Sequence, residues 1–287
     1  MIEADKLKMS DPVFQELNSR ENQDAEIARV VHSYSTNAAN EQLIAGLSSG
    51  CDIVMDGTLT WSPYVEATIS MARNAHLYSY SLGRGWVPEE EIEEYWVQGA
   101  PLQPPTDGIE RLPYQIEILG VTTAAALAVG RGLRRKLVTG RGVPVSAQLR
   151  SHRMFSENFE KYLPLVDRAY LYDTTDSKAH LLVSYDDART DSPMMIFRDG
   201  RYAEFCRKKH LNIHANCAAA LFTPGKGEET GTEKGKGEGK GEDKGEGEGG
   251  ATRSAHGVSL QQEEEEEAPS WLSPDVAVRA LRAMIVL

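Results

Sequence analysis

Two aspartates stand at the ends of predicted strands, where a carboxylate can take part in catalysis. Asp5 follows residues 1–4, and Asp56 follows the apolar run at residues 51–55. In an open parallel α/β sheet, the chemistry lies just outside the carboxyl ends of the strands. A carboxylate there can deprotonate a hydroxyl group or bind a magnesium ion. The alternative is that each acid lies in a loop and caps the next helix.

A cluster of basic side chains is the second feature that could do chemistry. Arg131, Arg134, Arg135 and Lys136 fall in one predicted helix, and Arg141 follows closely. Positions 131, 134 and 135 share one helix face because they are three and four residues apart. Guanidinium groups suit phosphate oxygens and stabilise a phosphoryl group during transfer. The alternative is a solvated helix face that pairs with acidic residues elsewhere in the chain.

The GxxxxGK[ST] phosphate loop occurs nowhere in the sequence. The Gly-Arg-Gly triplets at 130–132 and 140–142 neither follow a strand nor open a helix, as a phosphate loop must. The motif search therefore gives no nucleotide site by itself.

The first 223 residues alternate between helix and strand patterns. Helices are predicted over 25–31, 35–47, 122–136 and 145–162, with another beginning at Ser62-Pro63; strands are predicted over 51–55, 114–121 and 169–172, with a hairpin of 181–185 and 194–197. Residues 83–112 are rich in glycine, proline and acids and predict a lid or an insertion. Helix–strand alternation at this spacing predicts an α/β fold with a doubly wound parallel sheet.

The chain has 287 residues and a net charge of −12, of which residues 224–270 contribute −7. That segment alternates glycine with charged residues and ends near five consecutive glutamates, so it cannot bury a core and is expected to be disordered. It is either an acidic arm that binds a protein partner or a low-complexity loop without one. After it, residues 271–287 predict a short closing helix that includes Val276, Leu281 and Ile285.

Composition excludes several classes of protein. No apolar run is long enough to span a bilayer, and the acidic start is not a targeting signal. Three cysteines without CxxC spacing argue against a disulfide framework or structural zinc. The mild acidity of the remaining chain argues against general nucleic-acid binding. We therefore expect no nucleic-acid or membrane partner and a cytoplasmic location.

Taken together, these motifs resemble the zeta-toxin family of P-loop kinases. In that family a second strand ends in an acid, as in IEADKLK at 2–8, and a [DE]GT motif ends the next, as at 56–58. An arginine-bearing lid helix and a glycine/basic/Val-Pro turn follow, which the turn at 139–144 resembles. Residues 31–74 look especially like the zeta-toxin domain of plant calmodulin-dependent NAD kinases and their relatives. The similarity covers about residues 1–216.

The resemblance implies roles for individual residues. Asp5 would be the general base that takes the proton from the acceptor hydroxyl, and Asp56 and Thr58 would contact the acceptor or orient the site near magnesium. Arg131 or Arg134, together with Arg141, would bind the nucleotide phosphates. ATP and Mg²⁺ would be required. The acceptor would be a nucleotide or sugar-nucleotide, of the NAD or UDP-amino-sugar type.

The chain departs from the family in one respect. The family's phosphate loop precedes the acid at Asp5, but only four residues stand there. The chain is then either N-terminally truncated or has lost catalysis. We expect a sheet that lacks its first strand, with unpaired edges beside the gap. We also expect poor solubility or need of a partner, and impaired phosphoryl transfer.

The alternative function is a non-catalytic interaction protein. It would keep the fold as a scaffold and present the acidic segment to basic partners. Deleting residues 224–270 separates the two functions, because a kinase should be indifferent to the deletion and an interaction protein should lose its partner.

Overall fold

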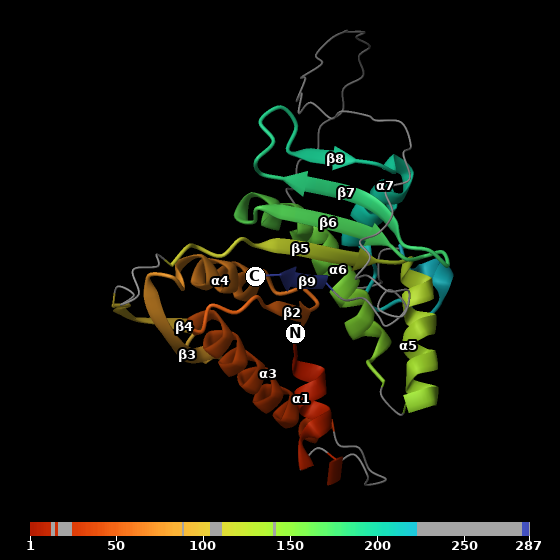
Figure 1. Cartoon of the computed structure of the whole chain (residues 1–287). Coiled ribbons are helices and arrows are strands. Elements are labelled where there is room, and N and C mark those ends of the chain that lie inside the picture. The colour runs from red at the N-terminus through yellow and green to blue at the C-terminus, as the bar shows by residue number, and fades with distance from the viewer. Residues whose placement is uncertain are drawn as a thin grey trace, which may run out of the picture.

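The computed structural model describes residues 1–12, 15–16, 25–87, 89–103, 111–139, 142–222 and 283–286. Within them, one sheet has the strand order β1-β2-β9-β5-β6-β7-β8, as Figure 1 shows. The strands are β1 (Ile2–Glu3), β2 (Val54–Gly57), β5 (Glu117–Thr122), β6 (Arg168–Asp173), β7 (His180–Asp186), β8 (Met194–Ile196) and β9 (Ala283–Val286).

The sheet is mixed, with four strands that run the same way. β1 is parallel to β2, and β5 is parallel to β6. β9 is antiparallel to both β2 and β5, so these two also share one direction. β7 and β8 continue the sheet as an antiparallel hairpin, as the sequence predicted. The α/β class is therefore confirmed. Among the described strands, only β1 with β2 and β5 with β6 form parallel pairs, so the sheet is not parallel throughout as predicted.

The strand β9 occupies the middle of the sheet. Ile285 lies opposite Met55 of β2 on one side and opposite Ile118 of β5 on the other. The prediction of unpaired edges between these strands is therefore wrong, because the far end of the same chain supplies a strand. Ile285 was also expected in a closing helix, and the backbone there is extended instead.

Six helices accompany the described sheet: α1 (Ala4–Ser10), α3 (Ala25–Ser48), α4 (Ser62–Asn74), α5 (Ala125–Thr139), α6 (Val145–Tyr162) and α7 (Asp199–Arg207). Short 3₁₀ turns follow at η1 (Leu163–Leu165), η2 (Lys208–His210) and η3 (Ala218–Ala220). The bounds predicted for α6 are confirmed. The two helices predicted over 25–31 and 35–47 are one, since residues 32–34 between them contain no glycine or proline. None of the helices in the described part of the chain is long and apolar enough to cross a membrane.

The main core packs α3, α4, α6 and α7 together with the central strands. Phe155 and Phe159 of α6 lie edge-to-face against Phe205 of α7, at ring-centroid distances of 5.5 and 5.7 Å. A Cβ atom added to Gly120 of β5 would come within 2.9 Å of the Phe155 ring. The glycine therefore allows α6 to approach the sheet closely.

The predicted lid or insertion at 83–112 contains part of a separate two-stranded sheet. Strands β3 (Tyr78–Val87) and β4 (Ile92–Pro101) form an antiparallel hairpin beside α4 (Figure 1). Trp96 of β4 donates a hydrogen bond from Nε1 to Oγ1 of Thr68 in α4, at 3.2 Å. The hairpin is thus attached to α4. Residues 104–110 lie outside the described part of the chain.

The central position of β9 leads to a test of stability. Ile285→Pro removes a backbone donor from a strand that has neighbours on both sides, where proline is not accommodated. We expect the free energy of unfolding to fall by about 1–3 kcal/mol, the cost of leaving a buried backbone partner unsatisfied. Ile285→Val, which keeps a β-branched residue, is the control. Equal denaturation midpoints in urea for the two variants would contradict the central placement of β9.

Candidate functional site

The carboxyl ends of the four parallel strands lie at one edge of the sheet, and Asp5, Asp56 and Thr58 lie at or near it. The backbone of Asp5 is in the first turn of α1, two residues after β1 ends at Glu3. Asp56 was expected just after its strand, but it is inside β2 and opposite Glu3. The strand is displaced from 51–55 to 54–57 because β1 and β9 pair there. Thr58 follows β2 directly and is exposed.

Glu3 is a site residue that the sequence did not indicate. It is only 9% exposed and forms an ion pair with Lys6, at 2.8 Å between Oε1 and Nζ. Its register opposite Asp56 places two acids on neighbouring strands. Glu3 was not predicted as a site residue, because only the acid that follows each strand was expected to take part. Glu3 lies within the run of residues 1–4 that predicted β1.

The loop between β2 and α4 is held in a single, unusual conformation. Leu59 has a φ of +50°, which is uncommon for a residue with a branched side chain. Its carbonyl accepts a hydrogen bond from the hydroxyl of Tyr162, at 3.0 Å. The carbonyl of Thr60 accepts another from Nδ2 of Asn158, at 2.9 Å. Two side chains of α6 thus fix the loop, and strained loops held by their surroundings are frequent at functional sites.

The hydroxyl groups of this loop face each other. Oγ1 of Thr58 and Oγ1 of Thr60 are 2.9 Å apart. Both groups can donate and accept hydrogen bonds, so they can bind hydroxyl or phosphate oxygens of a ligand. The pair follows β2, the strand that contains Asp56.

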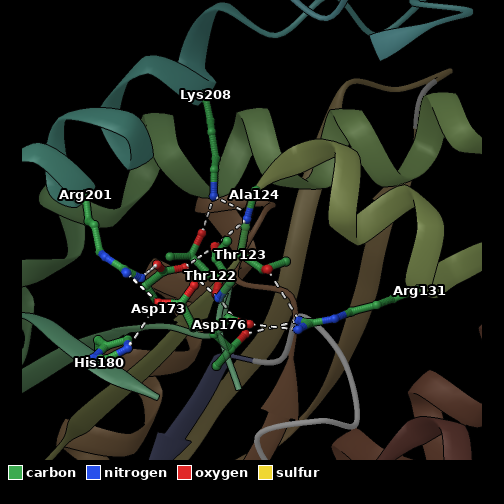
Figure 2. A network of polar contacts seen from close by, with 11 residues as sticks. Thr122, Thr123, Ala124, Arg131, Asp173, Asp176, His180, Arg201 and Lys208 are labelled. Carbon is green, nitrogen blue, oxygen red and sulfur yellow. Dashed lines mark hydrogen bonds and ion pairs between the residues drawn. The ribbon is translucent and has the colours of Figure 1, made fainter. Parts of the chain in front are cut away.

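Arg131 reaches the ends of β5 and β6 from the second turn of α5 (Figure 2). Its Nη1 donates to Oγ1 of Thr123 and Oγ1 of Thr174, both at 3.3 Å, and its Nη2 donates to the Thr174 carbonyl at 2.7 Å. Arg134 lies further along α5 and is exposed. The structure therefore brings Arg131 to the edge and leaves Arg134 at the helix surface. Arg141 lies outside the described residues.

A network of charged groups surrounds the ends of β5 and β6, as Figure 2 shows. Arg201 of α7 binds two aspartates, through Nη1 to Asp173 at 2.7 Å and through Nη2 to Asp176 at 2.5 Å. Asp173 also accepts from the hydroxyl of Thr175 at 2.6 Å. The bond from the Ala124 amide to that hydroxyl, at 2.9 Å, joins the two strand ends.

Lys208, the first residue of η2 directly after α7, completes the network (Figure 2). The side chain is buried, and Nζ donates to Oγ1 of Thr122 at 2.5 Å and to the carbonyl of Thr123 at 2.6 Å. Burial lowers the pKa of Lys208 to about 8, although the negative charges of Asp173 and Glu204 act in the opposite direction. Lys208 was not predicted as a site residue, because a lysine at a helix end usually indicates a solvated surface.

His152 of α6 is a buried group beside Lys208. Neither ring nitrogen has a hydrogen-bond partner among the described residues. Burial lowers the pKa of His152 to about 3, and the positive charge of Lys208 adds to the effect. The imidazole is therefore neutral at physiological pH.

Comparison with curated proteins finds a relative in a plant. The chain is 43% identical over 180 residues to the calmodulin calcium-dependent NAD kinase of Arabidopsis thaliana. The aligned part is 61% of this chain and 34% of that protein, so the chain spans about a third of the length of the relative it matches. No family model and no solved structure matches the chain. The identity shows that the two proteins are related.

The neutral His152 makes stability depend on pH. Its pKa is about 3 in the folded protein and about 6.5 in an unfolded chain, so the unfolded chain binds more protons between these values. This group then removes stability as the pH falls through that window, by roughly 1.4 kcal/mol per pH unit at most. His152→Leu should lose this part of the pH dependence.

Urea denaturation at pH 7 and pH 4.5 measures the effect. We expect a smaller loss of stability on acidification in His152→Leu than in the wild type. His210→Leu, which changes an exposed histidine, is the matched control and should behave as the wild type. Parallel pH profiles for all three proteins would contradict a neutral, buried His152.

Proposed function

We propose that this protein is a kinase-like phosphotransferase that transfers the γ-phosphoryl group of ATP to a hydroxyl group of a nucleotide, with NAD as the acceptor to test first. The observation that carries the proposal is the 43% identity over 180 residues to an NAD kinase. The geometry of the sheet edge supports it, because acids lie in or just after β1 and β2, hydroxyl groups follow β2, and an arginine lies at the ends of β5 and β6.

The proposed division of roles follows the order of the strands. Asp5 takes the proton from the acceptor hydroxyl, and the acceptor oxygen then forms a bond to the γ-phosphorus of ATP. The bond between this phosphorus and the oxygen that bridges to the β-phosphate breaks, and ADP leaves with the electron pair. Asp56 and Thr58 orient the acceptor, and Arg131 stabilises negative charge on the transferring group. The zeta-toxin resemblance and a P-loop-like fold belong to this proposal.

Magnesium fits the proposed site only when the phosphates of ATP supply some of its ligands. No group of three or more His, Cys, Asp or Glu in the described part of the chain is placed to hold a metal ion. Mg²⁺ commonly needs one or two carboxylates, with phosphate oxygens and water completing its shell. Asp56 is a suitable carboxylate. The ion would neutralise part of the phosphate charge.

The assignment of Asp5 is tested by a turnover assay with ATP, magnesium and NAD that measures NADP. General bases contribute about 10²–10⁴-fold, so Asp5→Asn should lower kcat by at least about 100-fold. Asp52→Asn is the matched control, because Asp52 is an exposed acid before β2 and away from the carboxyl edge. Equal turnover of both variants would overturn the assignment of the base. The rate of the wild-type chain in this assay also tests the expected impairment of phosphoryl transfer.

The role of Arg131 is tested separately from its bonds to Thr174. Arg131→Met removes a phosphate-binding cation and should raise KM for ATP and lower kcat, by about 10-fold or more in kcat/KM. Because the same change loosens α5, the thermal midpoint of the variant is measured alongside. Arg153→Met, which removes an arginine paired with Glu157 on the surface of α6, is the control. A normal kcat/KM in Arg131→Met would exclude this residue from the site.

A further inference from the structure

Trp61 presents an aromatic ring to solvent beside the proposed acceptor site. It is the last residue of the strained loop, three positions after Thr58, and α4 begins directly after it. Its side chain belongs to a residue that is 43% exposed. Large aromatic side chains are mostly buried in folded proteins, so a held but exposed indole is an informative exception.

The edge of the indole is fixed by two acceptors on the β3–β4 hairpin. Nε1–H of Trp61 is directed at Oε1 of Glu93, at 2.7 Å, and at the hydroxyl of Tyr95, at 2.6 Å. The Tyr95 hydroxyl in turn donates to Oε1 of Glu93, at 2.7 Å. The ring of Tyr95 packs edge-to-face on Tyr64 of α4, with centroids 5.2 Å apart. These contacts hold the nitrogen edge of Trp61 and do not use its ring face.

The backbone that carries Trp61 is equally constrained. The carbonyls of Leu59 and Thr60 are bound by side chains of α6, and Leu59 keeps its left-handed conformation. The position of the indole relative to the hydroxyl groups of Thr58 and Thr60 is therefore set before any ligand arrives.

We propose that the exposed face of Trp61 is a stacking platform for the planar heteroaromatic ring of the acceptor nucleotide. The proposal rests on the function proposed above, and it names the part of the acceptor that this end of the site recognises. Aromatic side chains stack on nucleotide bases because every base has a π-face. The hydroxyl groups of Thr58 and Thr60 would meet the sugar, and the carboxylate of Glu93 would accept from an amino or amide group on the ring.

Calorimetric binding to NAD and to ribose 5-phosphate, without ATP, tests the platform. NAD carries planar rings and ribose 5-phosphate carries none. Trp61→Ala should raise the Kd for NAD roughly 5- to 150-fold, the factor that corresponds to stacking one base on an aromatic ring. It should leave the Kd for ribose 5-phosphate unchanged. Leu77→Ala, which alters an exposed apolar residue beyond the other end of α4, should change neither constant.

Trp61→Phe separates stacking from a merely structural role. Phenylalanine keeps an aromatic face but loses the N–H that binds Glu93 and Tyr95. If Trp61 only ties the hairpin to α4, Trp61→Phe and Trp61→Ala should weaken NAD binding equally. If it is a platform, Trp61→Phe should keep most of the affinity of the wild type. Equal losses in the two variants would overturn the proposal.

The remaining outcomes distinguish this proposal from the proposed function. NAD binding that depends on the Trp61 ring, without formation of NADP, would reject the kinase and keep the platform. Formation of NADP with an unchanged Kd in Trp61→Ala would keep the kinase and reject the platform. NAD that binds no more tightly than ribose 5-phosphate, or not at all, would also reject the platform.

Discussion

The backbone pairing of β9 with β2 and β5 is the interaction on which the arrangement of the sheet depends. In the described part of the chain, β1 and β2 form one ladder, β5 to β8 form another, and β9 lies between them. Asp56 belongs to the first ladder and Thr122 to the second. Because β9 lies between β2 and β5, the acidic and the basic parts of the candidate site are separated by two inter-strand spacings, roughly 10 Å.

Helix α6 provides a second connection between the same two parts. Its rings pack against β5 and α7, while Asn158 and Tyr162 bind the loop that follows β2. The hydroxyl of Ser156 also donates to the carbonyl of Phe205 in α7, at 2.6 Å. One helix thus supports the loop of Thr58 and Trp61 and the helix that carries Arg201. The side chains of α6 thus connect the same two parts of the site that β9 connects through its backbone.

The elements that could be predicted are those with a local sequence signal. Ser62-Pro63 predicted the start of α4, and the bounds predicted for α6 are the observed ones. The strand β9 was not predicted, because a run of four apolar residues has no periodicity that separates strand from helix. What makes residues 283–286 a strand is pairing with residues far away in the sequence. Lys208 and Arg201 were missed for the same reason, since their partners stand in other segments.

The two ends of the candidate site are both rigid, and this bears on how it could work. The loop after β2 is fixed by α6, and the ends of β5 and β6 are fixed by ion pairs and hydrogen bonds around Asp173. Phosphoryl transfer depends mainly on positioning and on charges already in place, so groups that need no rearrangement favour it. The loop after β2 and the ends of β5 and β6 are thus already positioned in the folded protein, before a ligand binds. Binding energy from a ligand would then be available for the reacting groups, because the protein side of the site is already arranged.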